Sequence, residues 1–175
     1  MSSLFIDVLH RGVMADSYRK ICDWKEAKRR AQTWKKAGQR IGFTNGCFDI
    51  IHAGHIRYLQ DSAAQADQLI VGLNSDASVQ TLKGSRRPIV PEDDRAFVLS
   101  GLYAVAAIVI FEGETPLELI EWLEPDVLMK GGDYKAKEIV GYDSVTKRGG
   151  VVKVLPFLNG HSTTNIVQRI RELTT

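Results

Sequence analysis

The sequence predicts an α/β fold, a Rossmann-like doubly wound parallel sheet in a single domain. Apolar runs such as 68–73 and 104–111 alternate along the chain with segments of helical periodicity. Several runs are apolar throughout, which is typical of parallel strands buried on both faces. A strand expected at 40–43, a helix from Gly54 and the run 68–73 together form a βαβ unit. In such folds, ligands bind beyond the carboxyl ends of the strands, where the strand order reverses.

The first predicted helix begins after Asp23. Asp23 and Glu26 have the spacing of a capping box, and apolar residues recur at helical spacing from Trp24 to Trp34. The residues before this helix show no clear period. A length of 175 residues suits one domain. We therefore divide the chain into an N-terminal arm, residues 1–22, and a domain, residues 23–175.

The remaining elements follow from capping signals and periodicity. A helix is expected from Pro91, with three acidic residues in its first turn. Another is expected where Thr115, as an N-cap, precedes Pro116 and Glu118. The other expected helices lie at 77–82, 143–147 and 163–173, and the other expected strands at 104–111, 126–129 and 151–155.

Charge and composition exclude several classes of partner. The formal net charge is +2, from 23 basic and 21 acidic residues, so no overall field favours nucleic acid or a membrane surface. The longest apolar run, 104–111, is far shorter than the roughly 20 residues that span a bilayer. Cys22 and Cys47 are expected to be reduced thiols, because the N-terminus shows no secretory pattern. A cytoplasmic protein is therefore expected.

The segment 44–55 indicates chemistry most directly, because it follows a strand and opens a helix. Asn45 and Gly46 are expected to form a sharp turn that brings backbone amides close to a ligand. His52 and His55 can both donate hydrogen bonds to phosphate oxygens at this turn. The segment therefore predicts a phosphate-binding site.

The histidine pair could instead be a zinc site or two ordinary surface residues. Zinc requires further Cys or His ligands, and neither His10 nor His161 lies in a motif with metal-ligand spacing. No metal site is therefore predicted. Asp49, in the same segment, could contact magnesium or brace the loop, and the sequence leaves both roles open.

His52-Ala53-Gly54-His55 resembles the HxGH signature of the cytidylyltransferase-like nucleotidyltransferase superfamily. Further motifs follow in order along the chain. The set from about Trp24 to Leu173 is similar to the adenylyltransferase domain of heptose 1-phosphate adenylyltransferases, which occurs alone or fused to a sugar kinase. The further motifs are Asn74-Ser75-Asp76, Lys83-Gly84, Arg87-Pro88, Lys130 to Tyr134 and Ser162-Thr163-Thr164.

The resemblance implies catalytic roles for His52, His55 and Lys83. Other roles stay open, because Ser162 to Thr164 and Asp76 could merely cap helices, and the basic loop could be only solvated. Contacts with the substrate are implied for Asp76, Arg87 and Arg95. Contacts with the nucleotide are implied for Thr44, Asn45, Gly46, Phe48, Gly54, Lys130, Gly131, Asp133, Ser162, Thr163 and Thr164.

The activity implied by the resemblance is transfer of AMP from ATP, with Mg²⁺, to a sugar 1-phosphate. The expected acceptor is D-glycero-D-manno-heptose 1-phosphate, which would give ADP-heptose for the lipopolysaccharide core. Alternatives are transfer to another small phosphate such as glycerol 3-phosphate, or a nucleotide-binding regulator without turnover. We expect a homodimer, as the commonest assembly of soluble oligomers. The kinase that makes the 1-phosphate is expected on a separate chain.

Overall fold

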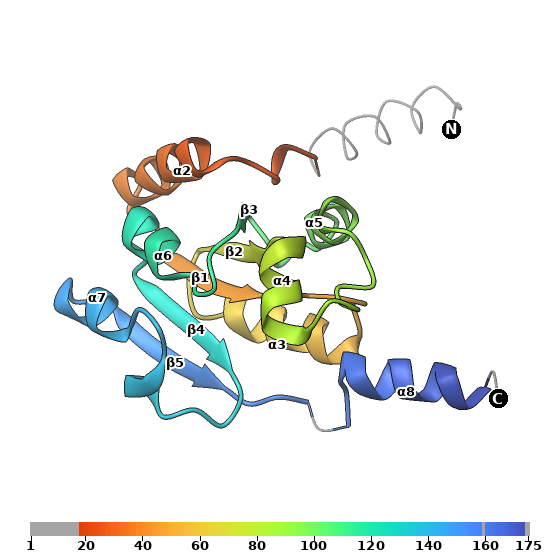
Figure 1. Ribbon diagram of the computed structural model, residues 1–175. Helices are drawn as coiled ribbons and strands as arrows, with labels where there is room; N and C mark the ends of the chain where they lie inside the picture. Colours follow the sequence, from red (N-terminus) through yellow and green to blue (C-terminus); the bar gives the residue numbers. More distant parts are fainter. Residues whose placement is uncertain (1–17, 159, 174–175) are drawn as a thin grey trace, which may run out of the picture.

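The computed structural model describes residues 18–158 and 160–173, and its centre is a five-stranded parallel sheet (Figure 1). The strands lie in the order β3-β2-β1-β4-β5. The predicted fold class is therefore confirmed. The strands are β1 (Ile41–Gly46), β2 (Gln68–Asn74), β3 (Ala107–Phe111), β4 (Val127–Gly131) and β5 (Val151–Leu155).

The strand order reverses at β1, which pairs with β2 on one side and with β4 on the other. Phe43, at the centre of β1, pairs with Ile70 of β2 and Leu128 of β4. In a doubly wound sheet, the connections on the two sides of this point run in opposite directions and leave a crevice at the carboxyl ends. The fold therefore places a binding site beyond β1 and β4.

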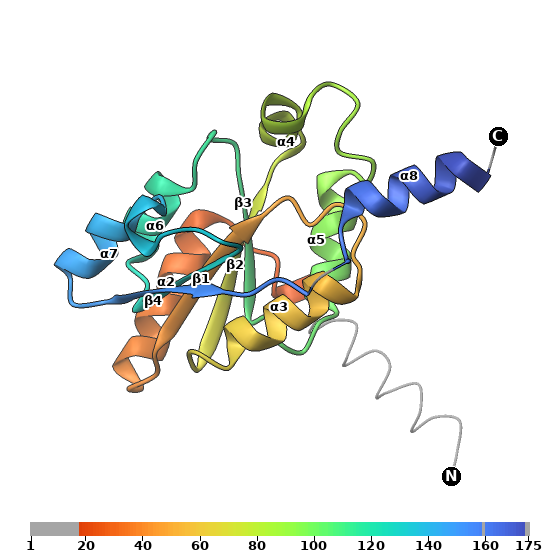
Figure 2. The same cartoon turned by 90° about the horizontal axis from the view of Figure 1, so that it is seen from below.

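Helices cover both faces of the sheet, as Figure 2 shows from below. Side chains of α2, α6 and α7 pack with Phe43 in one buried cluster, and those of α3 and α5 pack with Val71 in the other. The helices are α2 (Trp24–Lys36), α3 (Ala53–Ala63), α4 (Asp76–Lys83), α5 (Glu92–Ser100), α6 (Leu117–Leu123), α7 (Tyr142–Lys147) and α8 (Thr163–Leu173), with a 3₁₀ turn, η1 (Ala136–Glu138).

The described part of the N-terminal arm lies against the edge of the sheet. The Cys22 amide donates to the carbonyl of Ile108 in β3, and the Ile108 amide donates to the Lys20 carbonyl. Asp23 then accepts the Glu26 amide at 2.7 Å, as the capping box predicts. Among the residues that the structure describes, no helix is long and apolar enough to cross a membrane.

Two local predictions need correction. Asn45 and Gly46 do not form a turn, because β1 continues to Gly46 and both residues pair with β2. The chain bends instead at Phe48 and Ile50, whose φ angles are 46° and 55°. The N-cap of α6 is Pro116 rather than Thr115, because the Pro116 carbonyl accepts the first helical hydrogen bond, from Ile120.

Candidate active site

A cleft of about 560 Å³ opens at the carboxyl ends of the central strands. Its walls come from the end of β1, the first turn of α3, the last residues of α4, the loop after β3 and the end of β4. The cleft lies where the topology predicts ligand binding. The lining includes eight residues for which the sequence predicted a role: Asn45, Gly46, Phe48, His55, Lys83, Lys130, Gly131 and Thr163.

The two histidines stand together at the start of α3. His52 is the N-cap residue, and its Nδ1 accepts the backbone N–H of His55 at 3.4 Å. The two rings stack with centroids 3.8 Å apart. Because Nδ1 accepts a hydrogen bond, the neutral ring of His52 carries its hydrogen on Nε2, which can donate to a ligand. The local structure thus leaves a donor free beside the positive end of a helix dipole.

Burial lowers the pKa of both histidines, which favours their neutral rings. Burial lowers the pKa of His55 to about 4; nearby His52 and Lys83 lower it further, and Asp49 opposes the shift. Burial, with a smaller contribution from His161, also lowers the pKa of His52. The Nδ1 atom of His55 is buried and has no hydrogen-bond partner among the described residues. Such an atom is costly to leave unpaired, and an oxygen of a bound phosphate would supply its partner.

Lys130 brings a positive charge to the opposite wall. Its ammonium donates to the side-chain oxygen of Asn45 at 3.3 Å, and burial lowers the pKa of Lys130. Within the described part of the chain, it forms no ion pair with a carboxylate. A partly buried cation without a carboxylate partner is well suited to hold an anionic ligand.

Aromatic rings surround the end of β4. A Cβ atom on Gly131 would lie 3.0 Å from the Tyr58 ring and would overlap Phe157. Gly132, with φ of 121°, packs against Tyr134 and Phe157. Both glycines therefore allow rings to approach the backbone closely. Tyr58 and Phe157 were missed in the sequence, although Phe157 follows the end of a strand, where ligand-contacting residues gather.

Thr44 stands behind the cleft rather than in it. Its side chain is fully buried, and its hydroxyl lies 2.6 Å from that of Tyr58. The Thr44 hydroxyl therefore fixes the Tyr58 ring, which lines the cleft. A direct contact between Thr44 and a nucleotide, which the resemblance implied, does not agree with this placement.

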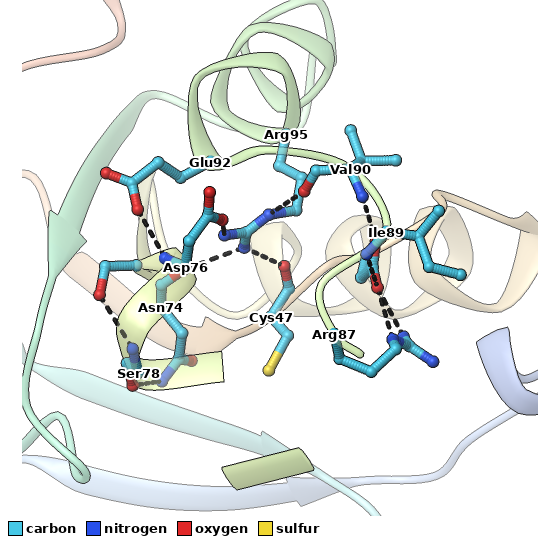
Figure 3. Close-up of polar contacts among 11 residues, drawn as sticks. Cys47, Asn74, Asp76, Ser78, Arg87, Ile89, Val90, Glu92 and Arg95 are labelled. Carbon is cyan, nitrogen blue, oxygen red and sulfur yellow. Dashed lines mark hydrogen bonds and ion pairs between the residues drawn. The ribbon is translucent and has the colours of Figure 1, made fainter. Parts of the chain in front are cut away.

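Arg95 does not face the cleft, contrary to the expectation for a substrate-binding residue. It is 1% exposed, and Figure 3 shows its guanidinium among backbone carbonyls. Its nitrogens donate to the carbonyls of Val90, Cys47 and Asn74 and form an ion pair with Asp76 at 2.7 Å. Because these donors are used inside the protein, Arg95 holds the ends of β1 and β2 together rather than binding a substrate, whereas the Asp76 side chain is 35% exposed and its contact with the substrate stays a prediction.

Arg87 is also directed inward. Its Nε donates to Asp49 at 2.8 Å, and the ion pair of the two side chains is 2.7 Å long. Asp49 accepts two more hydrogen bonds, from the amides of Ile89 and Val90. The sequence left two roles open for Asp49, contact with magnesium or bracing of the loop. These contacts are those of a residue that braces the loop. No described group of three His, Cys, Asp or Glu side chains could hold a metal ion.

The segment before α8 lies beside the histidines. The Thr163 hydroxyl donates to the Asp49 carbonyl at 2.6 Å, and the Ser162 hydroxyl accepts the Asn165 amide at 3.1 Å. Ser162 therefore caps α8, the alternative that the sequence left open, and its hydroxyl can still donate. A Cβ atom on Gly54 would lie 3.0 Å from His161, so this glycine lets the two segments meet.

Five other predicted residues do not line the cleft: His52, Gly54, Asp133, Ser162 and Thr164. Asp133 and Thr164 are exposed, and His52 lies beside the lining residue His55. The structure therefore gathers His52, His55, Lys83 and Lys130 near one cleft, and it turns Arg87 and Arg95 away.

Comparisons with known proteins agree with this geometry. The family model described as cytidylyltransferase-like matches residues 43–169. The bifunctional protein HldE of Wolinella succinogenes is 52% identical over 165 residues, which are 94% of this chain and 34% of that protein. HldE of Magnetococcus marinus is 50% identical over 86% of this chain and 31% of its own length. The chain thus spans about a third of the length of these relatives.

Solved structures show the same fold. A lipopolysaccharide core biosynthesis protein from Thermoplasma volcanium matches with a TM-score of 0.56 and 27% identity, over 69% of this chain and 98% of that one. Pantoate-beta-alanine ligase from Francisella tularensis matches with a TM-score of 0.56 over 89% of this chain and 79% of its own. At 16% identity, the ligase supports the fold alone. With a family match over most of its length and the paired histidines at the predicted cleft, the chain belongs to the cytidylyltransferase-like family and is a nucleotidyltransferase.

Proposed function

We propose that the protein transfers AMP from ATP to D-glycero-D-manno-heptose 1-phosphate and releases pyrophosphate. The observation that carries the transfer chemistry is the pair of neutral histidines beside Lys83, in a cleft at the switch point of the sheet. Similarity to the HldE proteins and to the heptose 1-phosphate adenylyltransferases supports the choice of acceptor. The Thermoplasma relative, a lipopolysaccharide core biosynthesis protein, supports it further.

The acceptor needs no dedicated general base. A sugar 1-phosphate is already ionised at neutral pH, so its oxygen can attack the α-phosphorus of ATP in line. The new P–O bond forms as the bond to pyrophosphate breaks, and negative charge moves to the leaving group. Two histidine N–H groups and Lys83 would stabilise that charge. No covalent intermediate with the protein is required.

Lys130 and the hydroxyls at the start of α8 complete the proposed nucleotide site. Lys130 lies beside Asn45, and Thr163 lines the same cleft. Ser162 and Thr163 stand at a helix N-terminus, where backbone N–H groups and hydroxyls favour phosphate. We assign the base to the wall of Gly131, Tyr58 and Phe157, because aromatic rings and close backbone suit a flat heterocycle.

Mg²⁺ is proposed to enter with ATP. The described residues offer cations and N–H donors rather than a cluster of carboxylates, and both oxygens of Asp49 are already hydrogen-bonded. This arrangement fits a magnesium ion held mainly by phosphate oxygens and water, as is usual at triphosphate sites. When bound, the ion would neutralise phosphate charge.

Three expectations about partners and place stay predictions: a homodimer, a cytoplasmic location and a kinase on a separate chain. The relatives are described as bifunctional and are about three times longer than the matched region. Light scattering at micromolar concentration would test the dimer, and a monomer would contradict it.

Substrate choice is tested by supplying each nucleoside triphosphate with a panel of sugar and alditol phosphates while pyrophosphate is measured. We expect ATP with heptose 1-phosphate to give the highest kcat/KM, with CTP lower by roughly ten- to a hundredfold. Equal use of CTP would contradict adenylyl specificity. If glycerol 3-phosphate and CTP gave the highest kcat/KM, glycerol 3-phosphate would replace heptose 1-phosphate as the proposed acceptor. Tight ATP binding without turnover would favour a regulatory protein.

A further inference from the structure

The loop after β1 contains two residues in a conformation that side chains rarely adopt. Phe48 has φ of 46° and Ile50 has φ of 55°, and Asp49 lies between them. For a β-branched residue such as Ile50, a positive φ is a genuine outlier. Strained residues of this kind persist only where the surrounding contacts over-determine them, and they cluster at ligand sites. The contacts of Asp49 are therefore the place to look for what holds this loop.

The carboxylate of Asp49 joins this loop to the segment that follows α4. Asp49 is 2% exposed, and it accepts hydrogen bonds from the Arg87 side chain and from the amides of Ile89 at 2.9 Å and Val90 at 3.0 Å. Arg87, Ile89 and Val90 lie on one stretch of chain in Figure 3. That stretch connects Lys83, the last residue of α4, to the first turn of α5. One buried carboxylate thus sets where the basic loop lies.

The backbone carbonyl of Asp49 joins the same loop to α8. It accepts the hydroxyl hydrogen of Thr163, the first residue of that helix, at 2.6 Å. No residue of α8 is buried, and the helix projects from the body of the protein (Figure 2). The hydrogen bond to Asp49 is one of the contacts that fix its N-terminus. His161 beside Gly54 is another.

We propose that Asp49 is a positioning residue that holds three phosphate-binding segments in register: the histidine loop, the basic loop and the start of α8. It is not a catalytic residue, because its carboxylate is buried and fully hydrogen-bonded within the protein. Its effect is exerted through the placement of His55, Lys83 and Thr163. The inference rests on nucleotide binding at this cleft and is independent of which sugar phosphate is used.

The first test compares Asp49→Asn with Asp61→Asn. The amide keeps the shape of Asp49 but loses its charge and presents hydrogens to the donors of the basic loop. We expect kcat/KM to fall roughly 100-fold, because a misplacement near 1 Å can cost that much. Asp61 is a matched control, since it pairs with Arg57 on the exposed side of α3. Asp61→Asn should leave kcat/KM unchanged.

A second measurement separates positioning from a purely structural role. The affinity for a non-hydrolysable ATP analogue is measured by calorimetry, and hydrogen exchange is followed in residues 163–173. Asp49→Asn should weaken binding roughly tenfold and speed exchange at the start of α8, because the loop that holds Thr163 has shifted. Unchanged analogue affinity and unchanged exchange in a folded Asp49→Asn variant would overturn the proposal, even if its stability were lower.

Thr163 provides an independent test if Asp49→Asn does not fold. Thr163→Val removes the hydroxyl that donates to the Asp49 carbonyl, and Thr163→Ser keeps it. Exchange at the start of α8, measured without nucleotide, should be faster in Thr163→Val and restored in Thr163→Ser. Because no ligand is present, a hydroxyl that served only to bind phosphate would leave this exchange unchanged, and that result would contradict the link between Asp49 and α8.

The two proposals fail separately. If the wild-type protein turned over no heptose 1-phosphate, the proposed acceptor would be wrong, but calorimetry and hydrogen exchange would still test Asp49. If the wild type turned over heptose 1-phosphate while Asp49→Asn matched it in every measurement, the positioning role alone would be refuted.

Discussion

The two sides of the cleft are held by different interactions. On the histidine side, residues 45–55, buried charges fix the backbone: Asp49 pairs with Arg87, and nearby Arg95 ties Cys47 to β2. On the glycine side, residues 131–132, rings of Tyr58 and Phe157 pack against backbone without side chains. The first side fixes donors for anionic oxygens, whereas the second leaves a flat apolar surface. A change on the histidine side should therefore alter turnover and stability. A change on the glycine side should alter nucleotide affinity.

The largest expected effect is on the stability of the histidine side. Arg95→Met removes the buried donor of three backbone carbonyls and of Asp76, whose side chain is 35% exposed. Leaving a buried acceptor without its donor costs about 1–3 kcal/mol of unfolding free energy, and three carbonyls lose their donor here. Urea denaturation measures this loss, with the exposed Arg86→Met as the control, expected within about 0.5 kcal/mol of wild type. Equal midpoints for both variants would show that Arg95 is not the tie between β1 and β2.

The second expected effect is on turnover. His52→Ala and His55→Ala should each lower kcat roughly 100-fold or more, because each removes an N–H donor to the developing charge. Circular dichroism should show that both variants keep the fold. The glycine side gives the contrast, since Gly131→Ala should change kcat far less than either histidine variant. Unchanged turnover in both histidine variants would contradict the proposed role of the histidines in transfer.

The two sides also differ in how far the sequence predicted them. The histidine motif was found because its residues are contiguous and stand between a strand and a helix. The fold class and the order of elements followed from periodicity, which is a local property. Tyr58 and Phe157 were missed because they come together only through the pairing of β1 with β4 and of β4 with β5. No local pattern marks such a contact.

Buried charges were the other point at which sequence reasoning failed. Arg87 and Arg95 lie in a basic, acidic and glycine-containing stretch that resembles a solvated loop as much as a phosphate site. Their inward direction depends on Asp49 and Asp76, which precede them by 38 and 19 residues. Cationic residues in a motif were assumed to meet the ligand, whereas these two meet the loops that hold the ligand-binding residues.

The third expected effect is on nucleotide affinity at the glycine side. In Gly131→Ala the new methyl group would lie 3.0 Å from the Tyr58 ring, which cannot retreat because its hydroxyl is bonded to Thr44. Phe157 is 61% exposed and can move, so the chain should still fold. We expect the KM for ATP to rise roughly tenfold, as overpacking by one methyl group suggests. Gly101→Ala, whose nearest neighbour would lie 3.5 Å away, should leave KM unchanged. An unaltered KM for ATP in Gly131→Ala would contradict the placement of the nucleotide base against this wall.

The smallest expected effect is the dependence of stability on pH, and it belongs to the histidine side. The pKa of His55 is about 4 in the folded protein and 6.5 when unperturbed, because burial disfavours the charged ring. Between these values the unfolded chain binds more protons, so the unfolding free energy rises with pH. The stabilising contribution is complete above pH 6.5 and is lost as the pH falls toward 4. His52, whose pKa burial also lowers, acts in the same direction.

Urea denaturation between pH 7 and 4 measures this dependence. His55→Asn, which does not titrate, should lose stability less steeply than wild type, whereas Gly131→Ala should keep the wild-type slope because it changes no titratable group. Carboxylates act at lower pH: Arg29 and Arg30 lower the pKa of Glu26 to about 2, so its contribution is lost below its ordinary value of 4.5. The slope for Glu26→Gln should therefore differ from that of wild type only below pH 4.5, where wild type loses this contribution and the variant has none to lose. Parallel slopes for wild type and His55→Asn would mean that folding does not lower the pKa of the ring, and the assignment of a neutral donor to the histidine side would then lose its support.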